Sequence, residues 1–201
     1  EGHWGLTKQQ FAEVASAGDW NEAYERIVTG CPLFREGEDL MVDKSPAYLQ
    51  ALPNILAKVS EKPCLVLEKD ALLTYHSYKR RDFPIKNFID YFNTCQASLR
   101  EAEQNFSIRR ISQKRLSEEQ SQVFEELCDY LGLDFHQDYV TRHWCKHNMH
   151  GISFIWLFKK PYDYREAVNR ALAEVTKDEL ALLNDHLERI GNDTMFETLE
   201  S

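Results

Sequence analysis

The stretch Lys62-Pro63-Cys64-Leu65-Val66-Leu67-Glu68 decides the predicted fold. A short apolar run entered through a proline, with helical patterns on both sides, is typical of a buried parallel strand. Residues 106–111, Phe-Ser-Ile-Arg-Arg-Ile, indicate a second strand. Helices and strands alternate along the chain, so we predict an α/β domain with a small parallel sheet flanked by helices. A sheet of two strands exposes its edges, and we expect further strands upstream of Glu1.

Helical patterns fill most of the remaining chain. The predicted helices cover residues 7–28 with a break at 17–19, 46–60, 70–80, 84–103, a segment opened by Ser117 and ended by Gly132, 163–174 and 177–190. Capping boxes mark the helix starts at Thr7, Ser117 and Thr176, each with Gln or Glu three residues later. No linker or repeat divides the 201 residues, so we predict one domain over residues 1–201.

The composition limits the classes of function. A formal net charge of −9 disfavours general nucleic-acid binding, because an acidic chain repels phosphate backbones. A local basic cluster can still bind a small anion, and two are present, Lys79-Arg80-Arg81 and Arg109-Arg110. Five scattered cysteines without a CxxC pair indicate buried free thiols rather than a disulfide framework. No signal peptide and no apolar run long enough to span a bilayer is found, so we expect no membrane segment.

The segment Leu65-Val66-Leu67-Glu68-Lys69-Asp70, with Ser77 further on, puts a cation at a strand end and a hydroxyl two turns into the next helix. Two such groups can converge on one phosphate. The segment resembles the nucleotide-dependent sulfotransferases, in which an Arg-Asp-Pro-like turn ends a buried strand and a Ser follows eight residues after the Arg. In that family the Arg and Ser hold the 3′-phosphate of 3′-phosphoadenosine 5′-phosphosulfate (PAPS). The resemblance implies this role for Lys69 and Ser77, with Lys in place of the bidentate Arg and Ala71 in place of the Pro.

Three further segments resemble the same family. Asp43-Lys44-Ser45-Pro46-Ala47-Tyr48 is similar to its Glu-Lys-Thr/Ser-Pro-x-Tyr segment beside the substrate cleft, which implies substrate-binding roles for Lys44 and Tyr48. The same segment also fits a helix start, in which Ser45 would be the N-cap and Pro46 would lie in the first turn. Residues 127–133, Leu-Cys-Asp-Tyr-Leu-Gly-Leu, resemble its Leu-Cys-x-Phe-Leu-Gly-Leu helix. Residues 147–153 are similar to the Gly-Asn loop that closes over the nucleotide, and Lys159 or Lys160 would be the basic residue that ends it.

The start, Glu1-Gly2-His3-Trp4, resembles the Glu-x-His-Phe segment of carbohydrate sulfotransferases. There a base takes the proton of the acceptor hydroxyl as it attacks the sulfuryl sulfur. The resemblance implies Glu1 and His3 as catalytic base and helper, PAPS as co-substrate, 3′-phosphoadenosine 5′-phosphate (PAP) as product, and a small-molecule or carbohydrate acceptor.

The resemblance also implies a P-loop-NTPase-like sulfotransferase fold. The 5′-phosphosulfate loop of that family, a Gly/Ser/Thr-rich turn between a strand and a helix, has no counterpart in residues 1–40. We therefore expect the N-terminal strand, loop and helix to be missing from the given chain. A cytoplasmic protein of the bacterial type is expected, with the Golgi lumen as the alternative.

Three other interpretations stay open. His143, Cys145 and His147 alternate, with His150 nearby, and these side chains can bind zinc; no CxxC accompanies them, and we expect no metal. A non-catalytic binding or scaffold protein of the sulfotransferase fold would explain Lys69, Ala71 and the lack of the family's Tyr-Glu-Asp-Leu element, where residues 113–116 read Gln-Lys-Arg-Leu. A plain helical interaction module is the third, and the apolar strand argues against it.

Overall fold

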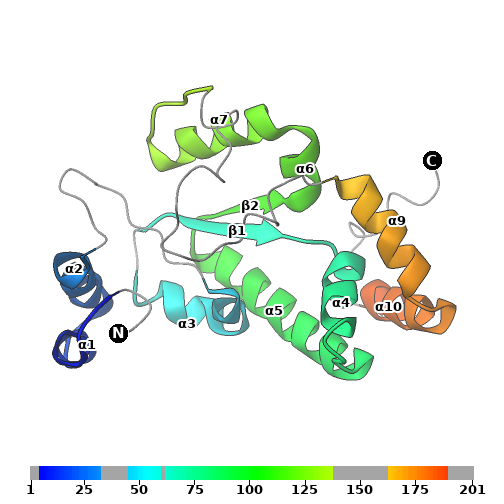
Figure 1. Cartoon of the computed structure of the whole chain (residues 1–201), viewed down its shortest axis with the longest axis horizontal. Coiled ribbons are helices and arrows are strands. Elements are labelled where there is room, and N and C mark those ends of the chain that lie inside the picture. The colour runs from blue at the N-terminus through cyan, green and yellow to red at the C-terminus, as the bar shows by residue number, and fades with distance from the viewer. Residues whose placement is uncertain (1–4, 33–44, 60–61, 138–162, 190–201) are drawn as a thin grey trace. The chain divides into compact units, whose positions relative to one another are not determined.

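The computed structural model describes residues 5–32, 45–59, 62–137 and 163–189 (Figure 1). The chain divides into two compact units. The first consists of Glu1–Lys62 and Cys95–Phe106, and the second of Pro63–Thr94 and Ser107–Ser201. The helix α5 (Ile85–Asn105) contributes to both. These units are compact parts of the structure, and their division does not test whether residues 1–201 form one domain, which stays a prediction.

The second unit holds the sheet. The strands β1 (Cys64–Glu68) and β2 (Ile108–Ser112) pair in parallel, with Cys64 opposite Ile108 and Glu68 opposite Ser112. The prediction of an α/β fold with a small parallel sheet is therefore confirmed at this level. Both strands lie within two residues of their predicted positions.

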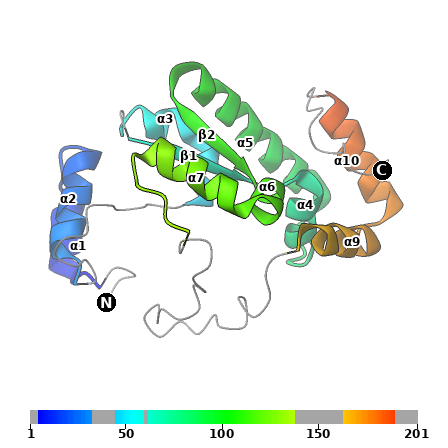
Figure 2. The same cartoon turned by 90° about the horizontal axis from the view of Figure 1, so that it is seen from above.

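Helices surround this sheet in the second unit. They are α4 (Ala71–Lys79), α6 (Gln113–Glu118), α7 (Gln120–Leu131), α9 (Tyr164–Glu174) and α10 (Lys177–Arg189). Figures 1 and 2 show α6 and α7 on one face of the sheet, and α4, α9 and α10 grouped beyond the carboxyl end of β1. The helix α4 contacts both α9 and α10, so two segments that are far apart in the sequence meet there.

A hydrophobic cluster fixes α4 in this group. Its buried members come from α4, α9, α10, the first turns of α5 and the α9–α10 connection: Ala71, Leu72, Leu73, Tyr75, Phe88, Phe92, Tyr164, Ala171, Val175 and Leu183. The Tyr75 and Phe88 rings lie with their centroids 5.3 Å apart. Burial of such side chains is the main favourable term in folding. It determines where α4 places its remaining, polar side chains.

The sheet is buried unevenly. Val66 is only 6% exposed, whereas Leu65 is 41% and Leu67 59% exposed. Parallel sheets are usually covered on both faces. The prediction of a buried strand thus holds for the side of β1 that carries Val66, and the expectation of additional strands stays a prediction.

The first unit is helical. It contains α1 (Lys8–Ala15), α2 (Trp20–Gly30), the 3₁₀ helix η1 (Pro46–Ala51), α3 (Leu52–Leu56) and the second half of α5. The predicted break between the first two helices is confirmed. The predicted helix over 46–60 is instead two short ones, divided where Pro53 stands near the start of α3.

The predicted helix caps have mixed outcomes. The capping box at Thr7 forms, Thr176 and Glu179 bond each other's backbone N–H groups, and Gly132 ends α7 with a left-handed φ of 67°. The capping box at Ser117 is wrong, because α7 begins after Glu119, which makes no side-chain cap. Ser117 lies inside α6, a short helix that was not predicted, and Ser112 caps that helix by accepting a hydrogen bond from the Arg115 N–H at 3.0 Å.

No helix among the described ranges combines the length and apolar character that a bilayer crossing needs.

Candidate anion-binding site

The candidate site lies where β1 ends and α4 begins. Asp70 stands between them as the N-cap of α4, and its carboxylate accepts a hydrogen bond from the Leu73 N–H at 2.7 Å. Because the strands are parallel and Glu68 lies opposite Ser112, both carboxyl ends meet at this edge of the sheet. In open α/β sheets, ligands bind outside the carboxyl ends of the strands.

Lys69 and Ser77 converge at this junction, and together they define the Lys69–Ser77 site. The Lys69 ammonium donates a hydrogen bond to Ser77 Oγ at 2.8 Å. Ser77 Oγ in turn donates to the Leu73 carbonyl at 3.1 Å. Side chains on a helix lean toward its N-terminus, so the Ser77 hydroxyl reaches back toward the end of the strand. The two groups that the sequence indicates for one phosphate therefore share one place.

The Lys69 ammonium has no carboxylate partner within the described ranges. An ammonium has three N–H donors, and Ser77 accepts one of them. Burial lowers the pKa of Lys69; the negative charge of Asp70 opposes this change, and the positive charge of Arg81 adds to it. A half-buried cation with spare donors is stabilised by an anion that accepts from it.

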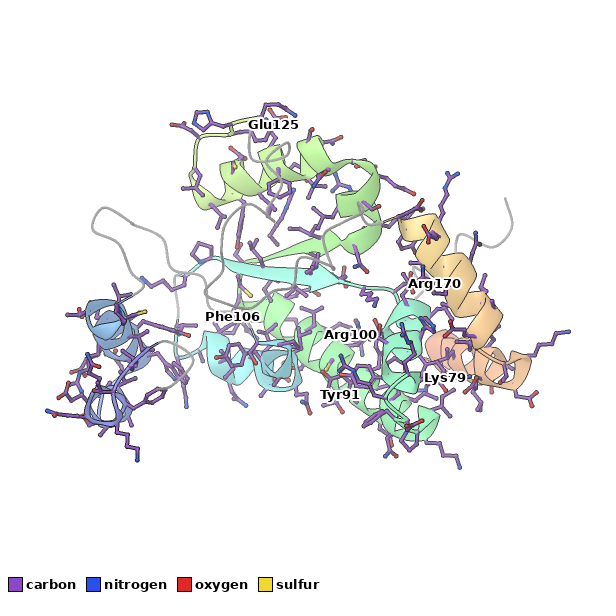
Figure 3. All side chains as sticks on the ribbon, viewed as in Figure 1. Lys79, Tyr91, Arg100, Phe106, Glu125 and Arg170 are labelled. Carbon is purple, nitrogen blue, oxygen red and sulfur yellow. The ribbon has the colours of Figure 1, made fainter. Side chains whose placement is uncertain are left out.

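The basic cluster at residues 79–81 divides into separate roles. Lys79, labelled in Figure 3, donates to Glu179 at 2.6 Å and to the Glu174 carbonyl at 2.9 Å. Arg81 is exposed and lies in the turn that follows the end of α4 at Lys79. Its positive charge lowers the pKa of Lys69, so Arg81 adds positive potential to the Lys69–Ser77 site.

Polar contacts anchor α4 to the two C-terminal helices. Tyr75 donates its hydroxyl to Glu179 at 2.5 Å, and His76 Nε2 lies 2.7 Å from the Glu174 carboxylate. Burial opposes the charge of Glu179, but hydrogen bonds from Lys79 and Tyr75 outweigh it and hold its pKa at about 2. These contacts and the hydrophobic cluster hold the helix that carries Ser77.

The second basic cluster is neutralised. Arg109 pairs with Glu126 of α7 at 2.6 Å, and Arg110 pairs with Glu68 of β1. Glu126 also accepts from Arg115 at 2.9 Å, and the hydrogen bonds from Arg115 lower its pKa to about 2. The predicted anion-binding potential of Arg109 and Arg110 is therefore taken up by carboxylates of the same unit.

An open hollow beside α7 has the opposite character. It is lined by Gln122, Glu125, Glu126, Cys128, Asp129, Leu133, Asp134 and Phe135. Tyr130, from the same end of α7, accepts a hydrogen bond from the Cys64 N–H at 3.2 Å, at the amino end of β1. Four acidic residues disfavour an anion there, and no cluster of His, Cys, Asp and Glu suited to a metal occurs in the part of the chain that the structure describes.

The other predicted site residues are not brought together with Lys69. Tyr48 lies half-buried in η1 and belongs to the first unit. Glu1, His3, Lys44 and Lys159 lie outside the described residues. The zinc-competent residues at positions 143, 145, 147 and 150 lie outside them as well. The catalytic and acceptor-binding roles thus stay predictions.

Arg81 was predicted only as a member of the basic cluster at residues 79–81, without a link to Lys69. Tyr164 was missed, and the sequence carries no signal for it. Its hydroxyl donates to Asp70 at 2.6 Å across a separation of 94 residues. Helical periodicity reports neighbours within one element and is silent on such distant pairs.

Comparisons with known proteins add no relative. A scan of protein-family models, a search of curated proteins and a search of solved structures each found no match to the chain. The functional argument therefore depends on the Lys69–Ser77 site and on the segments that resemble sulfotransferases.

Proposed function

We propose that the Lys69–Ser77 site binds the 3′-phosphate of PAPS, and that the protein transfers the sulfuryl group of PAPS to a hydroxyl of a carbohydrate acceptor. One observation carries the proposal: the Lys69 ammonium lies 2.8 Å from Ser77 Oγ and has no carboxylate partner in the described ranges. The strand-to-helix junction at a parallel sheet edge is consistent with a P-loop-like sulfotransferase fold, which we propose on the same ground.

The phosphate would be held by side chains rather than by helix N–H groups. Asp70 already takes the Leu73 N–H of the first turn of α4, and its negative charge repels an anion from that helix end. The free N–H donors of Lys69 are left to bind phosphate oxygens, and the Ser77 hydroxyl can donate to one of them once it turns away from the Leu73 carbonyl. Arg81 adds a second positive charge, which suits the doubly charged phosphate monoester.

The proposed reaction is a direct in-line displacement. The acceptor oxygen forms a bond to sulfur while the bond between sulfur and the bridging phosphate oxygen breaks, and PAP leaves with the electron pair. The proton of the acceptor hydroxyl passes to a base, which the resemblance assigns to Glu1 with His3. Lys69 and Ser77 position the nucleotide through its 3′-phosphate and take no part in the transfer itself.

Calorimetry with two nucleotides tests the proposal. PAP carries a 3′-phosphate and adenosine 5′-monophosphate does not, so the unaltered protein should bind PAP at about micromolar strength or better and the monophosphate more weakly. The Lys69→Ala, Ser77→Ala double variant should lose this preference. Lys177→Ala is the matched control, because it removes a lysine from an exposed position on α10 and should keep the preference.

The outcomes separate the proposal from its alternative. Equal affinity for both nucleotides, or no heat with either, would exclude Lys69 and Ser77 as a 3′-phosphate site. PAP binding without PAP release from PAPS, in the presence of a panel of oligosaccharides, would favour a non-catalytic binding protein instead. That alternative accounts for Lys in place of the bidentate Arg at residue 69.

A further inference from the structure

Asp70 follows Lys69 directly in the chain, yet the two side chains do not pair. A carboxylate beside a half-buried ammonium is the expected counter-ion, because opposite charges attract more strongly where water is scarce. Instead, Asp70 Oδ1 accepts from the Leu73 N–H at 2.7 Å, and Asp70 Oδ2 accepts from the Tyr164 hydroxyl at 2.6 Å. Both oxygens of the adjacent carboxylate are thus directed to partners other than Lys69.

The position of the Tyr164 hydroxyl is fixed by packing. Tyr164 is the first residue of α9 and is 9% exposed. It belongs to the hydrophobic cluster that also contains Ala71 and Leu72 of α4. A buried tyrosine needs a hydrogen-bond partner for its hydroxyl, and a bond to an ionised carboxylate is among the stronger ones. The orientation of the Asp70 carboxylate is therefore set by a helix distant in sequence.

We propose that Tyr164 is a positioning residue that holds the Asp70 carboxylate away from Lys69, so that the spare N–H donors of the ammonium stay available to a phosphate beside Ser77. The identity of the ligand rests on the proposed function, whereas the separation of the two charges does not. Without the Tyr164 hydroxyl, Asp70 Oδ2 loses its donor, and the adjacent residue carries an ammonium with spare N–H groups. Asp70 would then compete with the phosphate for Lys69.

Two variants distinguish this positioning role from a role in which Tyr164 only holds α9 against α4. Tyr164→Phe removes the hydroxyl and keeps the buried ring, so the packing of the cluster is retained. Asp70→Asn added to that variant removes the competing charge, while asparagine still caps α4. A positioning role predicts that this second change restores phosphate binding, whereas a docking role predicts that it does not.

The experiment uses the whole chain in four forms: unaltered, Tyr164→Phe, Asp70→Asn and the double variant. Calorimetric titrations with PAP and with inorganic phosphate measure affinity, and thermal melting verifies that each form is folded. Tyr164→Phe should bind PAP about threefold to tenfold more weakly, since the competing ion pair is only half-buried. The double variant should bind at least as tightly as the unaltered protein. A double variant as weak as Tyr164→Phe would overturn the inference.

A second measurement needs no ligand. NMR titration of the Lys69 side chain should give a higher pKa in Tyr164→Phe than in the unaltered protein, and a return toward the original pKa in the double variant. Among the described residues, Asp70 and Arg81 are the charged groups that shift the pKa of Lys69, and of these two the change releases Asp70. An unchanged pKa in Tyr164→Phe contradicts the inference whatever the affinity does. Should the unaltered protein bind neither anion while the pKa responds as expected, the proposed function fails and the positioning role stands.

Discussion

The arginines of β2, Arg109 and Arg110, differ from Lys69 at the end of β1 in the side chains that contact them. Arg109 and Arg110 lie within β2, and each is paired with a glutamate of the same unit. Lys69 lies one residue beyond β1 and meets the Ser77 hydroxyl, while the neighbouring carboxylate of Asp70 is bound by Leu73 and Tyr164. The two arginines are neutralised by glutamates, whereas Lys69, a single cation between Glu68 and Asp70 in the sequence, has no carboxylate partner among the described residues.

The comparison indicates that the placement of carboxylates determines which cations can bind an anion. Several exposed cations of the described residues also lack a carboxylate partner, but Lys69 is half-buried and stands at the carboxyl end of the sheet. Perturbed charges in such positions gather at functional sites. This contrast is the physical basis for preferring the Lys69–Ser77 site.

The largest expected effect comes from replacing Lys69 and, in a separate variant, Arg109 by glutamine. Lys69→Gln should weaken PAP binding about tenfold to hundredfold, because it removes a charged hydrogen-bond donor of the proposed phosphate. Arg109→Gln should leave PAP binding within about twofold, because Glu126 already neutralises Arg109 and keeps Arg115 as a partner. Calorimetry of the two variants measures both values. Comparable losses in the two would break the comparison.

A smaller effect is expected on stability at the contact between α4 and α10, where Lys79 pairs with Glu179. Glu179→Gln should lower the free energy of unfolding at pH 7 by about 1 to 2 kcal/mol, because it weakens the bonds to Lys79 and Tyr75. Chemical denaturation measures this difference. PAP affinity should change little, since Glu179 does not contact Lys69 or Ser77 in the hydrogen bonds of the site.

The same pair gives a dependence on pH with a definite sign. Burial opposes the charge of Glu179, and hydrogen bonds from Lys79 and Tyr75 hold its pKa at about 2, below the ordinary value of 4.5. A carboxylate whose pKa is lowered in the folded state stabilises it fully above the ordinary pKa, and this stabilisation is lost as pH falls toward the lowered one. The advantage of the unaltered protein over Glu179→Gln should therefore shrink between pH 4.5 and pH 2. A constant difference over that range would show that the charge of Glu179 is not responsible.

Local features of the site were predictable from the sequence, and the distant ones were not. The apolar run ending at Glu68 specifies β1, and the spacing of Lys69 and Ser77 places them together once a helix starts at Asp70. The pairing of Arg109 with Glu126 depends instead on how α7 packs on the sheet. Interactions within one or two helical turns follow from periodicity, whereas contacts between elements depend on tertiary packing.

The capping error at Ser117 has the same origin. Its spacing to Gln120 fits a capping box, and the sequence signal is genuine. In the structure, Ser117 lies inside α6, a separate short helix that follows β2 directly, and α7 begins only after Glu119. The extra helix depends on where β2 ends, which the sequence located only to within a residue or two.

The smallest expected effect tests the chemistry of residue 69 rather than its charge. Lys69→Arg replaces a single ammonium by a planar fork that can bind two phosphate oxygens, so PAP affinity at pH 7 should rise about threefold to tenfold. The pH dependence distinguishes the two cations further. Burial lowers the pKa of Lys69 below its ordinary 10.5, so PAP binding by the unaltered protein should weaken as pH rises through that lowered value.

Arginine stays protonated in this range, so the variant should keep its affinity. Calorimetry at pH 7, 9 and 10 compares the two proteins, with Lys177→Arg as the control for a lysine-to-arginine change on α10. Equal pH profiles for Lys69→Arg and the unaltered protein would mean that the charge of residue 69 does not hold the anion. The contrast between Lys69 and the two arginines of β2 would then reflect packing alone.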